Sequence, residues 1–362
     1  MKLKYFSAGL VLALAAVPHA AAHENDPAAP HAMDHAPIGV MGDHRHAEGE
    51  WMVSYRYMRM NMDGNRLGTD SISPDEIVTT QPNRFAGQPG QPPTLRVVPE
   101  DMQMNMHMAG FMYGLSDRVT LMLMGNYVTS SMNHITYQGG MGTTRLGGFT
   151  TEVEGIGDTS VTAIIGLDDG STPDRQLNLN LGLSLPTGSI EETDTILTPM
   201  GMTPTPRLPY PMQTSSGTWD AKAALTWWQK KGQWSFGSQG SALVRLDDND
   251  AGYALGDRYE ATAWLAYEPL HWASVSGRIK GVSQGSIDGS DPNIVAPVQT
   301  ANPDNQGGET VEALLGLNLV GQQGALRGQR LAFEVGLPLY RDLNGLQLET
   351  DTTFTVGWQK AW

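Results

Sequence analysis

The chain of 362 residues contains no cysteine, so no disulfide can hold its fold together. Long apolar runs are also missing after the first 22 residues, which argues against a transmembrane helix in the remainder. Basic residues are few, with 23 Lys and Arg against 38 Asp and Glu. The resulting net charge of −15 argues against nucleic acid as a partner, because nucleic-acid binding requires basic surfaces.

Recognisable catalytic motifs are absent as well. The sequence contains neither the G-x-S-x-G of serine hydrolases nor the H-E-x-x-H of zinc proteases. His134, with Ser130 and Ser131 nearby, is the one candidate for a hydrolytic site, and it comes without a motif. The protein is therefore not expected to be an enzyme.

Residues 1–22 have the pattern of a secretory signal peptide. Lys2 and Lys4 precede an apolar run, and an Ala-Ala-Ala cleavage site follows it, so the mature chain is expected to begin at His23. Residues 23–50 are polar, rich in Pro, Ala and His, and without periodicity. This composition predicts a flexible periplasmic extension.

From Trp51 to the end of the chain, apolar and polar residues alternate with a period of two. The clearest example is QLNLNLGLSL at residues 176–185, where every leucine falls on one face. Segments of about ten residues have the length of a tilted strand that crosses a bilayer. Lipid leaves no unpaired strand edge tolerable, so such strands must close on themselves. Residues 51–362 are therefore predicted to form an all-β, transmembrane, antiparallel up-and-down β-barrel of about 12 strands.

The predicted connections alternate between short and long. Short links fall at 116–117, 169–175, 230–232, 268–270 and 321–328, and long ones at 63–101, 131–157, 187–217 and 284–308. Bacterial outer-membrane barrels have short periplasmic turns and long extracellular loops, so both chain ends are expected in the periplasm. The terminal Trp362 follows alternating apolar residues, a pattern that resembles the signal read by the outer-membrane assembly machinery.

Four segments carry a family resemblance. They are YRYMRMNMDGNRLGT at 55–69, MHMAGFMYGLSDRVTLMLMGNY at 106–127, GIGDTSV at 155–161 and LAFEVGLPLYRDLNGLQLETD at 331–351. These segments resemble a family of outer-membrane transporters labelled with the MetA pathway of phenol degradation. The resemblance covers most of the chain after Trp51. It implies an outer-membrane channel for hydrophobic or aromatic compounds.

Methionine occupies alternate positions on the polar faces of the first predicted strands. The candidate lumen contacts are Met58, Met60, Met62, Met102, Met104, Met106, Met108, Met112, Met122 and Met124. The first two strands are joined by an outer loop, so Met58–Met62 and Met102–Met108 are expected to lie side by side. Thioethers select soft ions such as Cu(I) and Ag(I), but methionine also fills irregular gaps and offers apolar contact to a solute.

Histidine is concentrated near the start of the mature chain. The candidate metal ligands are His23, His31, His35, His44 and His46. Neutral imidazoles on a flexible tether chelate copper, zinc or nickel, and the competing interpretation is that these histidines are incidental. Their spacing matches no closed structural zinc site.

Charged residues also fall on the predicted inner face. Glu260, Glu312, Glu334 and Arg245 either set the selectivity of a pore or form ion pairs that brace the barrel. The sequence thus predicts a protein of the outer-membrane lipid bilayer that passes a small solute, with a link to copper or silver ions and no required cofactor. The alternatives are a channel for small hydrophobic or aromatic compounds, or a plugged barrel with a structural or surface-binding role.

Overall fold

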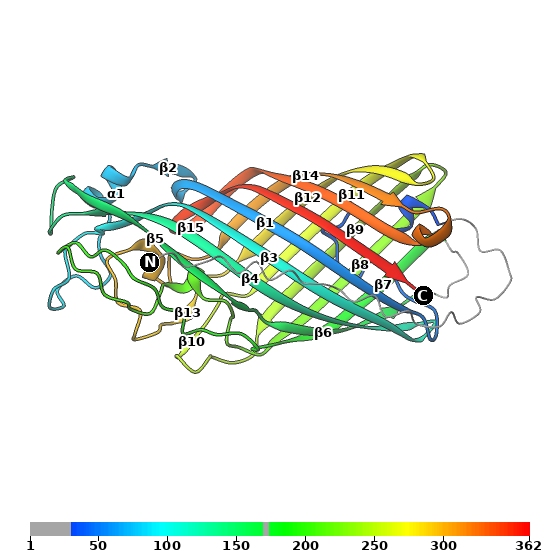
Figure 1. Cartoon of the computed structure of the whole chain (residues 1–362), viewed down its shortest axis with the longest axis horizontal. Helices are drawn as coiled ribbons and strands as arrows, with labels where there is room; N and C mark the ends of the chain where they lie inside the picture. Colours follow the sequence, from blue (N-terminus) through cyan, green and yellow to red (C-terminus); the bar gives the residue numbers. More distant parts are fainter. Residues whose placement is uncertain (1–29, 169–173) are drawn as a thin grey trace, which may run out of the picture.

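The computed structural model describes residues 30–168 and 174–362, and the predicted signal peptide and His23 lie outside these ranges. The alternating segments form one closed antiparallel sheet (Figure 1). Its wall strands are β1 (Trp51–Gly68), β3 (Val97–Ser116), β4 (Val119–Tyr137), β6 (Thr159–Gly166), β7 (Arg175–Leu185), β8 (Asp220–Lys231), β9 (Trp234–Arg245), β11 (Arg258–Leu270), β12 (Ala273–Gln284), β14 (Gly308–Val320) and β15 (Gln329–Ala361). Each pairs with the next along the chain, and β15 pairs with β1 to close the barrel.

Strand β15 crosses the wall twice. Its residues 330–343 pair with β14, and its residues 343–361 pair with β1. The reversal falls at Asn344-Gly345, where Gly345 has a φ of 63° that favours glycine. The eleven wall strands of the described ranges therefore make twelve passes, counting β15 twice, which confirms the predicted barrel.

The two ends of the barrel differ (Figure 1). Short connections and the C-terminus mark one end, which we call the turn end. The long loops gather at the other, the loop end, with β2 (Asp70–Ile72), α1 (Pro74–Thr80), β5 (Arg145–Ile156), β10 (Tyr253–Ala254) and β13 (Asp288–Gly289). The remaining elements are the short 3-10 helices Ala32–Asp34, Tyr210–Met212, Gln299–Ala301 and Gly324–Leu326. None of the helices in the described ranges is long and apolar enough to cross a membrane.

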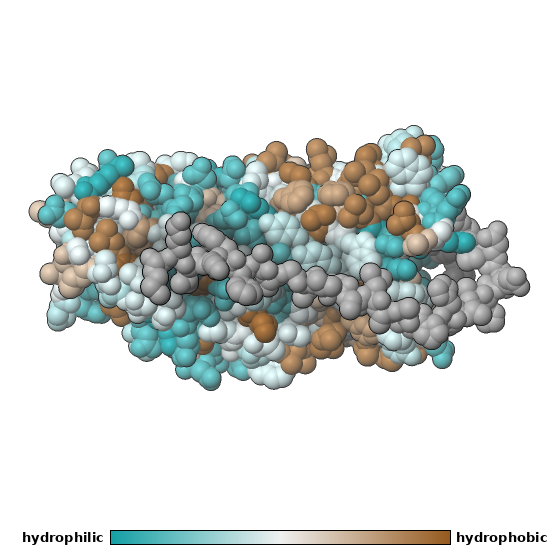
Figure 2. All heavy atoms as spheres, viewed as in Figure 1, coloured by the Kyte–Doolittle hydropathy of each residue, from teal (hydrophilic) through white to brown (hydrophobic). Residues whose placement is uncertain are grey.

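The outer face of the wall is apolar. Figure 2 shows hydrophobic residues gathered over the wall between its middle and the turn end. The exposed set includes Phe111, Leu121, Leu123, Leu181, Leu183, Leu225, Leu265, Val275, Ile279, Leu315 and Val335. Their polar neighbours in sequence point inward, as Thr120, Asn180 and Thr226 do. A belt of this kind matches a lipid environment.

The structure corrects the prediction that residues 23–50 form a flexible extension. Residues 30–50 pack within the barrel, and we call them the plug. Its buried residues include Ala32, Ile38 and Val40. Wall side chains donate hydrogen bonds to plug carbonyls: Asn178 and Trp228 to Asp43 (both 2.9 Å), Gln239 to Met41 (2.7 Å) and Arg330 to Ala36 (2.5 Å).

The last residues of the plug run against β3. The backbone N–H of Gly49 donates to the carbonyl of Gly114 at 2.9 Å. A Cβ added to Gly114 would lie 2.0 Å from the carbonyl oxygen of Ala47. Glycine at this wall position therefore permits the close backbone approach on which the plug depends.

Candidate functional site

A cavity of about 540 Å³ lies among the loops at the loop end, and we call it the outer cavity. Most of its lining is apolar, including Pro92, Pro93, Val97, Phe149, Ile196, Pro204, Leu208, Val295 and Val298. His134 lies in the same lining and stacks on Phe149, with ring centroids 4.6 Å apart and an interplanar angle of 3°. A largely apolar cavity with one stacked ring pair suits a small apolar molecule.

His134 does not form the hydrolytic site considered from the sequence. Its buried Nδ1 atom has no hydrogen-bond partner. Within the described ranges, no hydrogen bond joins its ring to Ser130 or Ser131 and no carboxylate orients it. A nucleophile and its base must lie within hydrogen-bonding reach, so this arrangement lacks the basis for such catalysis.

A second cavity, of about 550 Å³, lies within the barrel, and we call it the lumen cavity. Methionines of β1, β3 and β4 line one side of it: Met58, Met60, Met62, Met102, Met104 and Met132. The strand register places Met58 opposite Met106, Met60 opposite Met104 and Met62 opposite Met102, as the sequence predicted. Met106 and Met108 are half-buried on the same face.

The methionines nearer the turn end, Met112 and Met122, lie beside the plug. Met112 is paired with Met122 across β3 and β4, and both are buried. They pack with Met52, while Met41 of the plug and Met124 lie against the same cluster. These thioethers therefore fill space between wall and plug, which is the packing role considered from the sequence.

The opposite side of the lumen cavity is charged, and its charges are paired. Ion pairs join Glu334 to Arg278 at 2.7 Å, Glu312 to Lys280 at 2.7 Å and Glu260 to Arg258 at 3.2 Å. Arg245 pairs with Asp220 at 2.5 Å and does not line this cavity. Of the two interpretations weighed from the sequence, the pairing favours ions that brace the wall.

An apolar cluster separates the two cavities, and we call it the partition. It consists of Met102, Met132, Val153, Leu208 and Met212. Leu208 also lines the outer cavity, Met102 and Met132 line the lumen cavity, and the two cavities share no lining residue. The partition and the plug are therefore the two obstacles that the described residues place within the barrel.

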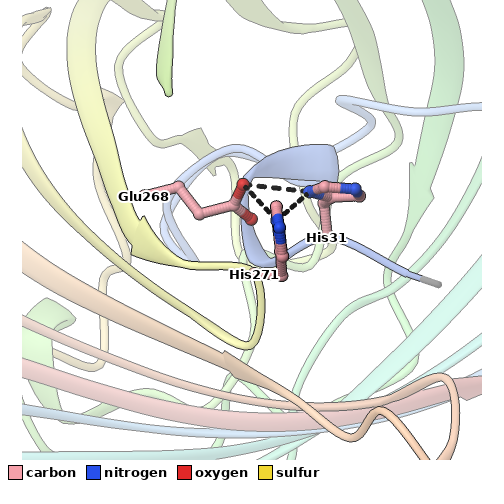
Figure 3. Close-up of side chains that lie close together, drawn as sticks. All are labelled: His31, Glu268 and His271. Carbon is pink, nitrogen blue, oxygen red and sulfur yellow. Dashed lines mark hydrogen bonds and ion pairs between the residues drawn. The ribbon is translucent and has the colours of Figure 1, made fainter. Parts of the chain in front are cut away.

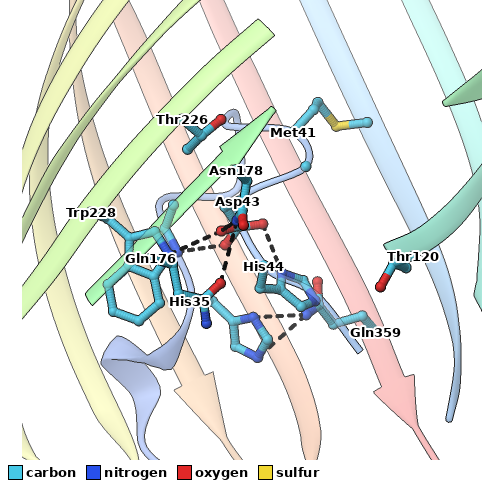
Figure 4. Close-up of polar contacts among 12 residues, drawn as sticks. His35, Met41, Asp43, His44, Thr120, Gln176, Asn178, Thr226, Trp228 and Gln359 are labelled. Carbon is cyan, nitrogen blue, oxygen red and sulfur yellow. Dashed lines mark hydrogen bonds and ion pairs between the residues drawn. The ribbon is translucent and has the colours of Figure 1, made fainter. Parts of the chain in front are cut away.

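The plug carries a buried polar cluster of its own (Figure 4). The Asp43 carboxylate accepts hydrogen bonds from the ring of His44 and from the N–H of Ala36, both at 2.8 Å. Burial lowers the pKa of His35 well below its usual value, and the charges of His44 and Arg330 add to the effect. Burial would raise the pKa of Asp43, but the neighbouring His44 holds it below its usual range. The hydrogen bonds of the Asp43 carboxylate thus join two parts of the plug, at Ala36 and at His44.

Three of the predicted histidines lie together in the structure. His44 stacks edge to face on His35 at 4.6 Å and on His46 at 5.1 Å, and His46 Nδ1 is 3.2 Å from Glu50 Oε2. His31 instead meets two residues of the β11–β12 turn region, Glu268 and His271 (Figure 3). These two wall residues were missed from the sequence, which gives no signal for a contact across more than 230 residues.

A closed twelve-pass barrel with an apolar belt, short turns and long loops is the fold of an outer-membrane β-barrel protein. The chain belongs to the family described as "Putative MetA-pathway of phenol degradation", whose model matches residues 86–302. No curated protein matches the sequence.

Solved structures of outer-membrane channels resemble the chain at low identity. An outer membrane channel from Pseudomonas putida F1 is 14% identical, with a TM-score of 0.56 over 89% of this chain and 99% of that one. The Pseudomonas putida toluene transporter TodX is 10% identical, with a TM-score of 0.43 over 88% and 91%. The Ralstonia pickettii toluene transporter TbuX is 10% identical, with a TM-score of 0.43 over 87% and 90%. The first supports the barrel fold, and the other two are too distant to add to it.

Proposed function

We propose that the protein is an outer-membrane channel that admits small apolar compounds, including aromatic ones. The apolar lining of the outer cavity is the observation that carries this proposal. A water-filled pore for polar solutes would need a mainly polar entrance. Most of this lining consists of prolines, aliphatic residues, methionines and Phe149, and its polar side chains are Gln91, His134, Thr151, Thr198 and Arg207. The family description, which refers to phenol degradation, agrees with an aromatic solute.

The proposed route runs from the loop end to the turn end, with the turn end in the periplasm. A solute enters the outer cavity, passes the partition at Leu208 and Met212, and reaches the methionine side of the lumen cavity. Methionine side chains are flexible, so they adapt to an apolar solute without a fixed polar partner. The plug is the final barrier, and its release completes the passage.

Phe149→Arg tests the outer cavity. Arginine replaces the aromatic surface that stacks on His134 with a charged group, so we expect uptake of toluene and phenol into proteoliposomes to fall about tenfold, equivalent to ~1.4 kcal/mol. Met141→Arg is the matched control, because Met141 lies in the connection between β4 and β5, is 81% exposed and does not line the cavity. Equal uptake by the two variants would rule out this entrance.

A second function, passage of Cu(I) or Ag(I), is supported by a separate observation. The strand register sets methionine directly opposite methionine at three successive inward positions of β1 and β3. Clustered thioethers are ligands for soft ions. The carboxylates across the lumen cavity are already paired with Arg or Lys, so the methionine sulfurs are the groups that would bind such an ion.

Changing Met58, Met60, Met106 and Met108 together to Leu separates the two functions. The substitution keeps side-chain volume nearly constant and removes the sulfurs, so we expect toluene uptake to stay within about twofold of wild type. Binding of Ag(I) by the purified protein is measured in parallel. Loss of Ag(I) binding together with loss of silver tolerance in cells would favour the soft-metal function instead.

A further inference from the structure

The strongest unassigned cluster lies at the turn end, where the plug begins. His31 starts the 3-10 helix of the plug, Glu268 is near the end of β11, and His271 is in the turn before β12. The N–H of Ala32 donates to the carbonyl of His271 at 2.9 Å, so the backbone itself holds plug and turn together. We propose that His31, Glu268 and His271 bind a borderline divalent cation of the Zn²⁺ class, which fastens the plug to the wall.

The donor atoms have the spacing of a metal's coordination shell. His31 Nδ1 is 3.0 Å from Glu268 Oε2 and 3.2 Å from His271 Nδ1, and His271 Nδ1 is 3.8 Å from the same oxygen (Figure 3). Donors bound to Zn²⁺ at 2.0–2.1 Å in a tetrahedron are about 3.3 Å from each other. The three observed separations bracket this value, so small side-chain rotations complete the set.

The ring tautomers also permit a cation. Two imidazole Nδ1 atoms face each other and one carboxylate oxygen, and a neutral imidazole carries one proton on only one of its nitrogens. When both rings carry their proton on Nε2, three electron pairs converge on the space between the three groups, as a bound cation requires. The cluster also carries the charge of Glu268, which a divalent ion offsets.

The surroundings leave the cluster accessible and oriented. The Glu268 side chain is 2% exposed, whereas that of His271 is 75% exposed, which gives an ion access from the turn end. Glu268 also accepts the N–H of Met33 at 3.4 Å through its other oxygen, which helps to hold the carboxylate in place. The nearby Lys230 is bound to Asp34 at 2.6 Å, so its charge is already matched.

The chemistry of the donors selects the class of metal. Two imidazole nitrogens and one carboxylate with an open fourth position suit Zn²⁺, Cu²⁺ or Ni²⁺, whereas Mg²⁺ and Ca²⁺ prefer oxygen and Cu(I) prefers sulfur. This site is therefore distinct from the methionine rows. The other cluster, formed by His35, Asp43 and His44, is less suited to a cation because Arg330 lies close enough to lower the pKa of His35.

Calorimetric titration of the detergent-purified full chain with Zn²⁺, after treatment with a chelator, tests the site. We expect one equivalent to bind, and His271→Gln to weaken binding at least about 10–100-fold while the barrel stays folded, because His271 is exposed. His107→Gln is the matched control, since His107 is an exposed histidine of β3 that belongs to neither cluster, and we expect wild-type affinity.

Hydrogen exchange provides the second measurement. We expect Zn²⁺ to slow exchange of residues 31–36 in the wild type and in His107→Gln, and to have no such effect in His271→Gln. Absence of Zn²⁺ binding in the wild type, or wild-type affinity in His271→Gln, would overturn the proposal. Loss of binding in His35→Gln but not in His271→Gln would overturn it too, by assigning the ion to the other cluster. Toluene uptake by the metal-free protein is measured separately, so failure of the metal site and failure of the proposed channel function are distinguishable.

Discussion

Simultaneous removal of the plug and the partition is expected to produce a large, steady single-channel conductance in planar bilayers. The variant combines deletion of residues 31–46 with Leu208→Ala and Met212→Ala. The two barriers lie in series along the lumen, so the one that remains limits the current when the other is removed. We therefore expect each single change to give little conductance and the combination to exceed both by about tenfold or more.

Two outcomes would contradict this arrangement. If deletion of the plug alone gives the full conductance, the partition is not a barrier to ions. If the combined variant stays closed, the route lies elsewhere and neither element controls it. Leu181→Ala with Leu183→Ala, on the exposed outer face, is the matched control for the two substitutions. Migration of the folded barrel in detergent gels before and after heating verifies that each variant is intact.

The barrel itself was predictable because lipid imposes a strong rule on sequence. Outward positions within the lipid belt must be apolar, and every backbone group there must be paired within the sheet. Leu181 and Leu183 therefore alternate with Asn180 and Ser184, and the period is visible in the sequence alone. Consecutive strands are neighbours in an up-and-down barrel even where a long loop joins them, and both inward faces carry methionine, which is why the methionine rows of β1 and β3 were expected side by side.

The plug was not predictable for the opposite reason. Its backbone carbonyl groups accept hydrogen bonds from Asn178, Gln239 and Arg330. Every residue type has a backbone carbonyl, so this docking requires no particular sequence. No apolar period is needed, so residues 30–50 resemble a disordered segment in composition. The cluster of His31, Glu268 and His271 depends on this docking, and it was hidden from the sequence together with the plug.

Breaking the ion pair of Arg278 and Glu334 is expected to lower the free energy of unfolding more than any other proposed substitution. Both side chains are nearly inaccessible, at 3% and 2% exposure, and two hydrogen bonds of 2.9 and 2.7 Å join them. Arg278→Leu leaves a buried carboxylate without its partner, which costs about 3–5 kcal/mol. We expect Arg278→Leu with Glu334→Leu to recover most of this loss, because no charge then remains buried.

Arg258 and Glu260 provide the matched control on the same side of the lumen cavity. Arg258 is 44% exposed and its pair is 3.2 Å long, so Arg258→Leu is expected to change the free energy of unfolding by less than about 1 kcal/mol. Urea unfolding in detergent, followed by tryptophan fluorescence, compares the three variants. Equal losses of unfolding free energy for Arg278→Leu and Arg258→Leu would mean that water screens both ion pairs. Water would then reach the interior beside the plug as readily as the lumen cavity, and the plug would not seal the barrel.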